Sequence, residues 1–405
     1  MVRRSLAALS LVGLLLPLAL VAGPPAAGAK SGSAGRYIVV LDDRAAPNAV
    51  AAEHSRRFGA QVGHVYAHAL SGYSATLSER ALDRVRRDPR VAFVEPDGVV
   101  GVTHHRPGHG GGDTGGDTGD GGSDPTACAQ TLPWGIDRVE ADVSPTAVAG
   151  NCTGAVTNVT AYVIDTGVGK HSDLNLVHHV NFVGGRNTDC HGHGTHVAGT
   201  VAARDNGSDV VGVIPGAPIV GVKVLGCNGS GSTSGVIAGV DWVKGHAAGK
   251  RAVANMSLGG GASTALDNAV IAAANSGVTF AVAAGNSGAN ACGSSPARAG
   301  TTNGVVTTAA TDSADREASW SNYGSCVDIW APGVGVVSTR LGGGTTTKSG
   351  TSMASPHVAG AAALWRSTHT GTPSDTEAAL KAEQVTTGTA SKDARPIVLV
   401  QVDAF

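Results

Sequence analysis

The sequence Gly-Thr-Ser-Met-Ala-Ser-Pro at residues 350–356 is followed directly by a long, alanine-rich apolar run over residues 357–365. That run has the composition of a helix. Because the first turn of a helix tolerates proline, Pro356 predicts a helix start close to Ser352. A serine there lies among unpaired backbone N–H groups at the positive end of the helix dipole. Both features suit a nucleophile whose reaction generates an oxyanion. On these residues alone, a serine that only caps the helix is the simpler alternative.

The overall composition bounds the class of protein. The chain has 405 residues, enough for more than one domain, and 42% of them are hydrophobic, which excludes disorder throughout. The formal net charge is only -2, so nothing indicates nucleic acid or an anionic membrane as a partner. Glycine is abundant, with 59 residues, whereas aromatic residues make up 4%, which predicts compact turns and packing between small side chains.

The first 29 residues have the pattern of a secretory signal peptide. Arg3 and Arg4 precede an apolar run over residues 6–21, and an Ala-Gly-Ala sequence ends at residue 29. Because the apolar run is short for a membrane span, we expect export and cleavage, with a secreted, extracellular product and no membrane contact afterwards. An uncleaved anchor is the alternative.

The cysteines fit an exported protein. An even number of cysteines in an exported chain predicts disulfide bonds, and the sequence by itself leaves their pairing open. Buried free thiols are the alternative. The six cysteines are Cys128, Cys152, Cys190, Cys227, Cys292 and Cys326.

Residues 36–100 are predicted to form a domain of their own. Apolar strands alternate with two helices in the order βαββαβ, a split βαβ, ferredoxin-like α+β layout. Ser78 is the expected N-cap of the second helix. No cluster of metal ligands or catalytic groups occurs in this part of the sequence. The predicted elements are strand 37–41, helix 47–58, strands 61–66 and 72–77, helix 78–87 and strand 91–96.

Residues 104–127 predict a linker. The segment consists mostly of Gly, His, Asp and Thr with almost nothing apolar, so it cannot pack and should be flexible. His104, His105 and His109 could bind a metal, but a solvated linker explains them more simply.

From Cys128 to the C-terminus the pattern changes to alternating strands and helices. Apolar strands that alternate with helices predict an α/β fold with a mostly parallel, doubly wound sheet covered on both faces. Ligands of such sheets bind beyond the carboxyl ends of the strands, where Asp165, Leu258 and Asn286 are expected. The predicted elements are strands 159–164 and 219–225, helix 233–248, strand 252–257, helix 264–275, and strands 278–284, 305–310 and 327–330.

Three stretches of this second domain carry groups used in nucleophilic catalysis: Val-Ile-Asp-Thr-Gly at 163–167, the histidine-rich segment 191–200, and 350–356. They place an aspartate, a histidine and a serine in the order found in subtilisin, whereas chymotrypsin and the α/β-hydrolases use other orders. With these motifs the chain resembles the subtilisin-like serine proteases, or subtilases, and in particular their proteinase K and aqualysin branch.

The resemblance extends from residue 36 to beyond residue 365. Residues 258–260 and 283–286 are similar to the substrate-binding segments of the family, 320–324 is similar to another family stretch, and 36–100 resembles its inhibitory propeptide. The resemblance implies a propeptide over 30–103 and a subtilisin-like catalytic domain over 128–405. With the signal peptide over 1–29 and the linker over 104–127, the chain is expected to have four parts.

The resemblance also implies a role for each site residue. Ser352 attacks the scissile carbonyl, His196 takes its proton and passes it to the leaving amine, and Asp165 orients His196. The Asn286 amide and the Ser352 backbone N–H form the oxyanion hole. Asp165 and Asn286 as plain turn residues are the alternatives. The implied substrate-binding residues are Leu258, Gly259, Gly260, Ala283, Ala284 and Gly285.

A zinc site is an alternative use of the histidines. His191, His193 and His196 lie close in sequence, and the last two would share a helix face. No glutamate is arranged as in H-E-x-x-H, and the resemblance explains the motif without a metal. We therefore expect no cofactor for the chemistry.

Two structural features follow from the resemblance alone. Disulfides similar to those of the aqualysin branch would join Cys190 to Cys227 and Cys292 to Cys326, which leaves Cys128 with Cys152. Members of the family often bind structural calcium, and Asp328 lies where the proteinase K branch has a calcium-ligating carboxylate. An ordinary strand-end aspartate is the alternative.

The predicted function is a secreted serine endopeptidase made as a self-processing zymogen. Residues 36–100 would assist folding and then hold their C-terminal strand in the active site, and cleavage between about residues 103 and 127 would release a monomeric enzyme. Polypeptide substrates would bind as an added strand, so specificity is expected to be broad, with an apolar or aromatic residue before the cut.

Two other classes of function are less consistent with the sequence. An inactive homologue that only binds peptides would have lost a catalytic group, and none is missing. An esterase on an α/β-hydrolase fold would need a G-x-S-x-G motif, which does not occur, and a different order of catalytic groups.

Overall fold

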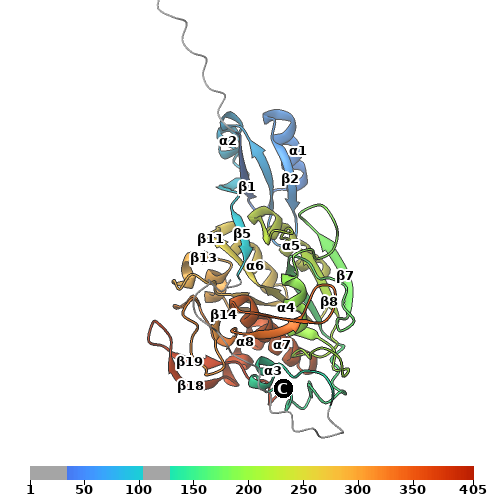
Figure 1. Cartoon of the computed structure of the whole chain (residues 1–405). Coiled ribbons are helices and arrows are strands. Elements are labelled where there is room, and N and C mark those ends of the chain that lie inside the picture. The colour runs from blue at the N-terminus through green and yellow to red at the C-terminus, as the bar shows by residue number, and fades with distance from the viewer. Residues whose placement is uncertain (1–33, 104–127) are drawn as a thin grey trace, which may run out of the picture. The chain divides into compact units, whose positions relative to one another are not determined.

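The structure, a computed structural model, describes residues 34–103 and 128–405, which belong to one compact unit (Figure 1). The predicted signal peptide over 1–29 and the predicted linker over 104–127, with its three histidines, lie outside the described residues. Among the helices of the described residues, none has the length and apolar character needed to cross a membrane.

The first described segment folds as predicted. Its four strands form an antiparallel sheet in the order β2-β3-β1-β4, and two helices complete the βαββαβ sequence. The side chain of Ser78 accepts a hydrogen bond from Ala81 N and so caps α2, as expected. The elements are β1 (Gly35–Leu41), α1 (Pro47–Phe58), β2 (Gln61–Tyr66), β3 (Gly72–Leu77), α2 (Glu79–Arg86) and β4 (Val91–Pro96).

The second segment is built on a mostly parallel sheet, which confirms the predicted fold class. The strand order is β18-β19-β15-β14-β12-β10-β6-β8-β7, and every neighbouring pair is parallel except β18 with β19 at one edge. The strands are β6 (Thr160–Asp165), β7 (Leu176–Asn181), β8 (Ile219–Lys223), β10 (Ala252–Met256), β12 (Val278–Ala283), β14 (Val305–Thr311), β15 (Ile329–Pro332), β18 (Val385–Ala390) and β19 (Pro396–Leu399).

Helices cover both faces of this sheet. Along β6, Ala161 and Val163 join the core cluster that includes residues of α4 and α7, whereas Tyr162 and Ile164 join the cluster that includes α5 and α6. This alternation is what a strand buried on both faces requires. The helices are α3 (Trp134–Arg138), α4 (His193–Ala202), α5 (Thr233–His246), α6 (Thr264–Ala274), α7 (Thr351–Thr368) and α8 (Pro373–Ala382).

A small sheet joins the two segments. Strand β5 (Val99–Val102), the end of the first segment, lies beside β11 (Leu258–Gly261) of the second (Figure 1). Its other edge pairs with β9 (Ser230–Ser232). The order of the sheet is β13-β11-β5-β9, with β13 at Ser294–Ser295. A separate hairpin of β16 (Val336–Thr339) and β17 (Thr345–Lys348) precedes α7. Short helices η1 (Ala291–Gly293) and η2 (Ala297–Thr301) complete the described elements.

The three disulfides are Cys128–Cys152, Cys190–Cys227 and Cys292–Cys326, with Cα–Cα distances of 5.4, 5.0 and 5.4 Å. These distances fall in the usual range for a disulfide. The predicted pairing is therefore confirmed.

Candidate active site

Asp165 and His193 form a buried pair at the carboxyl edge of the sheet. Asp165 is the last residue of β6, and His193 is the first residue of α4, directly after Gly192 in a left-handed conformation with φ 90°. The His193 Nδ1–H donates to Asp165 Oδ1 at 2.7 Å, and both side chains have no exposed surface. Because Nδ1 carries the proton in this pair, Nε2 is the nitrogen with a lone pair.

The prediction that His196 is the partner of Asp165 is wrong. His196 lies one helical turn further along α4, and its Nε2–H points to the carbonyls of Val336 and Thr346, both at 3.1 Å. Burial lowers the pKa of His196 from 6.5 to about 3, so the ring is neutral. The side chain therefore ties α4 to the β16–β17 hairpin.

A buried carboxylate that the sequence reasoning missed holds the start of α4. Asp189 is 3% exposed; its Oδ1 accepts from the backbone N–H groups of His191 and Gly192, and its Oδ2 from the N–H and hydroxyl of Thr195. The Thr166 hydroxyl, next to Asp165, also donates to Asp189 at 3.0 Å. Since these groups surround His193, Asp189 fixes the backbone that presents the imidazole.

Lys223 contributes a buried cation behind the same strand end. Its ammonium donates to the carbonyls of Thr166 and Leu225 at 2.6 and 2.9 Å. Burial lowers the pKa of Lys223, while Asp189 and Asp165 oppose that shift. The loop after Asp165 is thus held by Asp189 on one side and by Lys223 on the other.

Ser352 is the second residue of α7 and is fully buried. Its backbone N–H donates to the carbonyl of Thr103 at 3.1 Å. Its hydroxyl oxygen lies 2.6 Å from the Thr103 hydroxyl and 3.0 Å from the carbonyl of Ser257. The nucleophile candidate therefore meets the last described residue of the first segment, and a helix-capping role does not apply because the N-cap is Gly350.

Pro356 lies inside α7, not in its first turn as the sequence suggested. A proline has no N–H, so the carbonyl of Ser352, four residues earlier, has no helical partner. The Ser257 hydroxyl donates to that carbonyl at 2.8 Å, and Asn255 Nδ2 donates in turn to the Ser257 hydroxyl at 2.8 Å. The end of β10 therefore replaces the missing helical bond and fixes the backbone of Ser352.

Asn286 lies in the turn after β12, beside the start of α7. Its Oδ1 accepts from the N–H and from the hydroxyl of Thr351, at 3.0 and 2.8 Å. Its Nδ2 is buried and has no hydrogen-bond partner among the described residues. Because Thr351 holds the amide oxygen, the orientation of the amide is fixed and both N–H groups of Nδ2 remain available as donors.

Strand β5 fills the edge that was predicted to bind substrate. Val102, Gly101 and Val100 pair antiparallel with Leu258, Gly259 and Gly260, so those three predicted residues do bind main chain. A methyl group on Gly260 would lie 2.6 Å from the carbonyl oxygen of Val99, which explains the glycine. The opposite edge, β9, was missed.

Residues 283–285, which were also predicted to bind substrate, do not pair with β5. Ala283 and Ala284 are buried, and the backbone N–H of Ala284 donates to Thr308 O. The N–H of Gly285 donates to the hydroxyl of Thr351. Their role in substrate binding stays a prediction.

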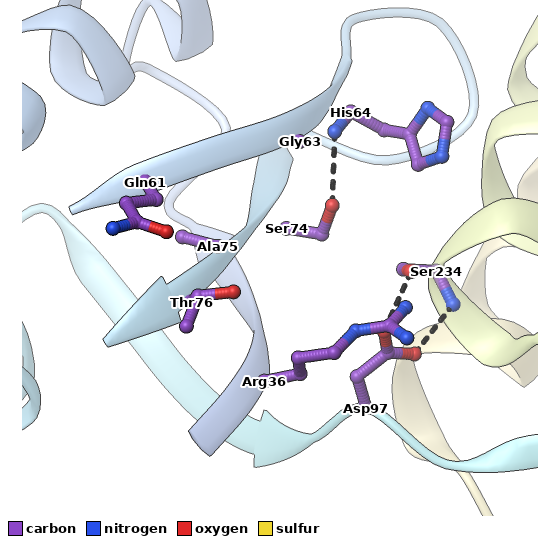
Figure 2. A pocket seen from close by; sticks show the side chains of 9 residues that line it. All are labelled: Arg36, Gln61, Gly63, His64, Ser74, Ala75, Thr76, Asp97 and Ser234. Carbon is purple, nitrogen blue, oxygen red and sulfur yellow. Dashed lines mark hydrogen bonds and ion pairs between the residues drawn. The ribbon is translucent and has the colours of Figure 1, made fainter. Parts of the chain in front are cut away.

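The first segment also contacts the second segment at places other than β5. Asp241 of α5 accepts from four successive backbone N–H groups, residues 67–70, at 2.6–3.5 Å. Asp97 accepts from the N–H and hydroxyl of Ser234 in the first turn of α5, and Glu95 accepts from the N–H groups at the start of α6. Figure 2 shows Asp97 between Arg36 and Ser234 in the pocket at this interface. Carboxylates at two helix N-termini are favourable placements.

The structure gives no support for calcium at Asp328, because both carboxylate oxygens already have protein partners, so the calcium site stays a prediction. One carboxylate oxygen accepts from Lys381 Nζ at 2.7 Å, and the other accepts from Thr307 N at 2.8 Å. Lys381 also bonds Glu377 at 2.6 Å. Burial raises the pKa of Asp328 to about 6, while the Lys381 ammonium opposes that rise. A lysine cation from α8 thus neutralises the carboxylate that a metal would need.

Two other groups in the described part of the chain contain metal-ligand residue types, and neither offers a set of unused ligand atoms. Cys128 and Cys152, beside Asp205, form a disulfide. His171, beside Asp173 and Asp209, uses both ring nitrogens: Nε2–H donates to Gly344 O, and Nδ1 accepts from the N–H of Asp173.

Comparison with known proteins identifies the family of both segments. Residues 157–399 match the model of the subtilase family, and residues 36–103 match that of the peptidase inhibitor I9 family. An alkaline serine exoprotease A of Vibrio alginolyticus is 44% identical over 79% of this chain and 56% of its own length. An extracellular serine proteinase of a Thermus species is 39% identical over 91% of this chain and 92% of its own. A crystal structure of a cold-adapted subtilisin-like serine proteinase superposes with a TM-score of 0.56 at 42% identity, covering 67% of this chain and 98% of that one.

Proposed function

Because the chain belongs to the subtilase family of serine proteases, we propose that it is a secreted endopeptidase made as a precursor that cleaves itself after Thr103. The observation that carries this proposal is the contact between Thr103 and Ser352. The Thr103 carbonyl accepts from the Ser352 N–H at 3.1 Å, and β5 is paired along both of its edges. A peptide bond held in this way is presented to the nucleophile as a substrate would be.

His193 acts as the general base in this proposal. Asp165 accepts the Nδ1–H, so Nε2 can take the proton of the Ser352 hydroxyl while the oxygen attacks the carbonyl carbon of Thr103. The imidazolium then gives that proton to the leaving amine, and the bond after Thr103 breaks. Asp165 stabilises the imidazolium while it exists. Water, activated by the same base, releases Thr103 from the acyl-enzyme.

The oxyanion is stabilised by two donors. The Ser352 N–H is already bonded to the Thr103 carbonyl, and the buried Nδ2 of Asn286 is the second donor. Loss of such an asparagine costs about 2.7–4 kcal/mol in kcat, a range established by mutagenesis of subtilisin, which is itself a member of this family.

The first segment acts as an intramolecular inhibitor after the cut. Its contacts with α5 and α6 do not involve the cleaved bond. They are made by Asp97 and Glu95 of the first segment and by Asp241 of α5. The processed strand β5 would therefore stay in place until these contacts are lost or the segment is digested. Release then opens the edges of β9 and β11 to other chains.

Specificity is expected to be broad, because most contacts with β5 are made by main-chain atoms. Val100, the fourth residue before the proposed cut, is 2% exposed, which favours apolar residues at that position. An apolar or aromatic preference immediately before the cut comes from the family resemblance. The processing residue Thr103 is small, so the self-cleavage does not test that preference.

The full chain with Ser352→Ala tests the proposal. The parent should yield a mature protein whose N-terminus is residue 104, read by mass spectrometry or Edman sequencing, and the variant should stay uncut. A serine-directed fluorophosphonate should label Ser352 in the mature parent. Maturation of the purified variant at the same bond, or an unlabelled Ser352, would contradict self-processing and favour a peptide-binding role.

A further inference from the structure

The turn that carries Asn286 is wrapped around one buried side chain, that of Asn322. Asn322 is 4% exposed, and its Nδ2 donates to the carbonyl of Ala284 at 2.8 Å. Its Oδ1 accepts from the N–H groups of Ser287 and Ala289, both at 3.0 Å. The side chain therefore binds the backbone on both sides of Asn286.

The backbone of Asn322 and its packing tighten this fit. The N–H of Asn322 donates to the carbonyl of Gly285 at 2.8 Å. Gly285 has φ 104°, and a methyl group there would lie 2.4 Å from Asn322 Nδ2. Residue 285 must be glycine because no other residue leaves room for the asparagine in this conformation. The path of the chain into Asn286 is thus shaped by Asn322.

Asn322 itself is anchored to the sheet. The hydroxyl of the preceding Ser321 accepts from the N–H of Ala310 in β14 at 3.0 Å. The ammonium of Lys392, from the loop between β18 and β19, donates to the carbonyl of Ser321 at 2.7 Å. The turn also returns a bond, since the N–H of Gly288 donates to the carbonyl of Trp320. These contacts make the Asn322 segment a fixed support.

We propose that Asn322 is a positioning residue for the oxyanion hole. Thr351 fixes the amide oxygen of Asn286, and Asn322 fixes the backbone from which that side chain extends, so together they aim Nδ2. This inference rests on the proposed role of Asn286. It gives a physical reason for the stretch 320–324, which sequence reasoning had singled out without a role.

The expected effect is on the rate of the chemical step. An oxyanion donor acts over hydrogen-bond distance, and a misplacement of about 1 Å can cost about 100-fold in rate. Asn322→Ala removes the three side-chain bonds that hold the turn. We expect it to slow cleavage after Thr103 by about 10- to 100-fold. That cleavage is intramolecular, so its rate constant contains no substrate-binding step.

The experiment is a double-mutant cycle on the full chain, with the rate of precursor cleavage followed after refolding. Asn286→Ala should slow the cut by about 100- to 1,000-fold. In that background Asn322→Ala should cost less than about threefold, because no donor remains to be aimed. If the two effects multiply instead, or if Asn322→Ala alone leaves the rate unchanged, the inference is overturned. If Asn286→Ala does not slow cleavage, the proposed oxyanion role itself is wrong.

Two further variants separate positioning from folding. Asn181→Ala is the matched control, because Asn181 holds the turn over residues 181–186 by four hydrogen bonds of its own. It should lower Tm without changing the cleavage rate. Asn322→Asp, which keeps both acceptor bonds, replaces the alanine variant if that chain does not fold, and should cleave at a rate between the parent and Asn286→Ala. A rate equal to the parent's would contradict the inference.

Discussion

His196 should make the protein sensitive to acid, although it takes no part in the proposed chemistry. The side chain is fully buried, and its pKa is lowered from 6.5 to about 3 in the folded chain. In the unfolded chain the ring would titrate near its ordinary value of about 6.5. Below that pH the unfolded state binds a proton that the folded state does not bind, so acid favours unfolding.

The magnitude follows from the two pKa values. pH 5 lies about 1.5 units below the pKa of the ring in the unfolded chain, and each unit corresponds to about 1.36 kcal/mol. Protonation at pH 5 therefore stabilises the unfolded state by about 2 kcal/mol. At pH 7.5 the same contribution is below about 0.1 kcal/mol. His196 alone should therefore remove about 2 kcal/mol from the free energy of unfolding between pH 7.5 and pH 5.

The assay is equilibrium unfolding of the full chain with Ser352→Ala, which avoids self-digestion, at both pH values. Replacing His196 with glutamine keeps an N–H donor near Val336 and Thr346 but removes the titrating group. The variant should lose stability at pH 7.5, yet its further loss on going to pH 5 should be about 2 kcal/mol smaller than the parent's. An exposed histidine, His369, replaced in the same way is the control. An unchanged pH dependence in the His196 variant would refute the reasoning.

Three other outcomes are expected. His193→Ala in the full chain should abolish cleavage after residue 103, whereas His196→Asn should still be cleaved in the fraction that folds. Mass spectrometry of the two variants measures the cleavage, and a cleaved His193→Ala chain would favour His196 as the base. Lys381→Ala should lower stability by about 1–3 kcal/mol and create a calcium-dependent rise in Tm absent from the parent, because Asp328 would then lack its cation; equal Tm values in calcium and EDTA would count against this. Asp241→Ala should speed dissociation of the processed propeptide by about 10- to 100-fold, followed as a shorter lag before activity, since four N–H groups lose a charged acceptor; an unchanged lag would show that this contact does not hold the inhibitor.

The sequence by itself determined the fold class and located much of the candidate site. The alternation of apolar strands with helices specified a parallel sheet covered on both faces, and the βαββαβ order of the first segment was readable because each element has a clear local period. Asp165 ends a strand, Asn286 lies in the turn after a strand, and Ser352 lies at a helix start, so local patterns locate all three. The disulfide pairing followed from family resemblance and agrees with the structure.

Only the tertiary structure decided which histidine faces Asp165. His193 and His196 lie three residues apart on one helix, so the motif contains both, and composition cannot separate them. His193 is the first residue of the helix, directly after Gly192, and so lies nearer the strand ends than His196. This position could have favoured His193 in the sequence analysis. The direction of the imidazole nevertheless depends on Asp189, which is linked to Thr166 and Thr195 across the fold.

Contacts with distant segments also explain the other features that the sequence did not predict. The carbonyl that Pro356 leaves without a partner is satisfied by Ser257, and the carboxylate of Asp328 is neutralised by Lys381. The strand ending at Thr103 gains its bonds from β9 and β11, far away in the chain. Local sequence specifies backbone period and the kind of chemistry available, whereas a hydrogen-bond or charge partner from a distant segment is fixed only once the chain has folded.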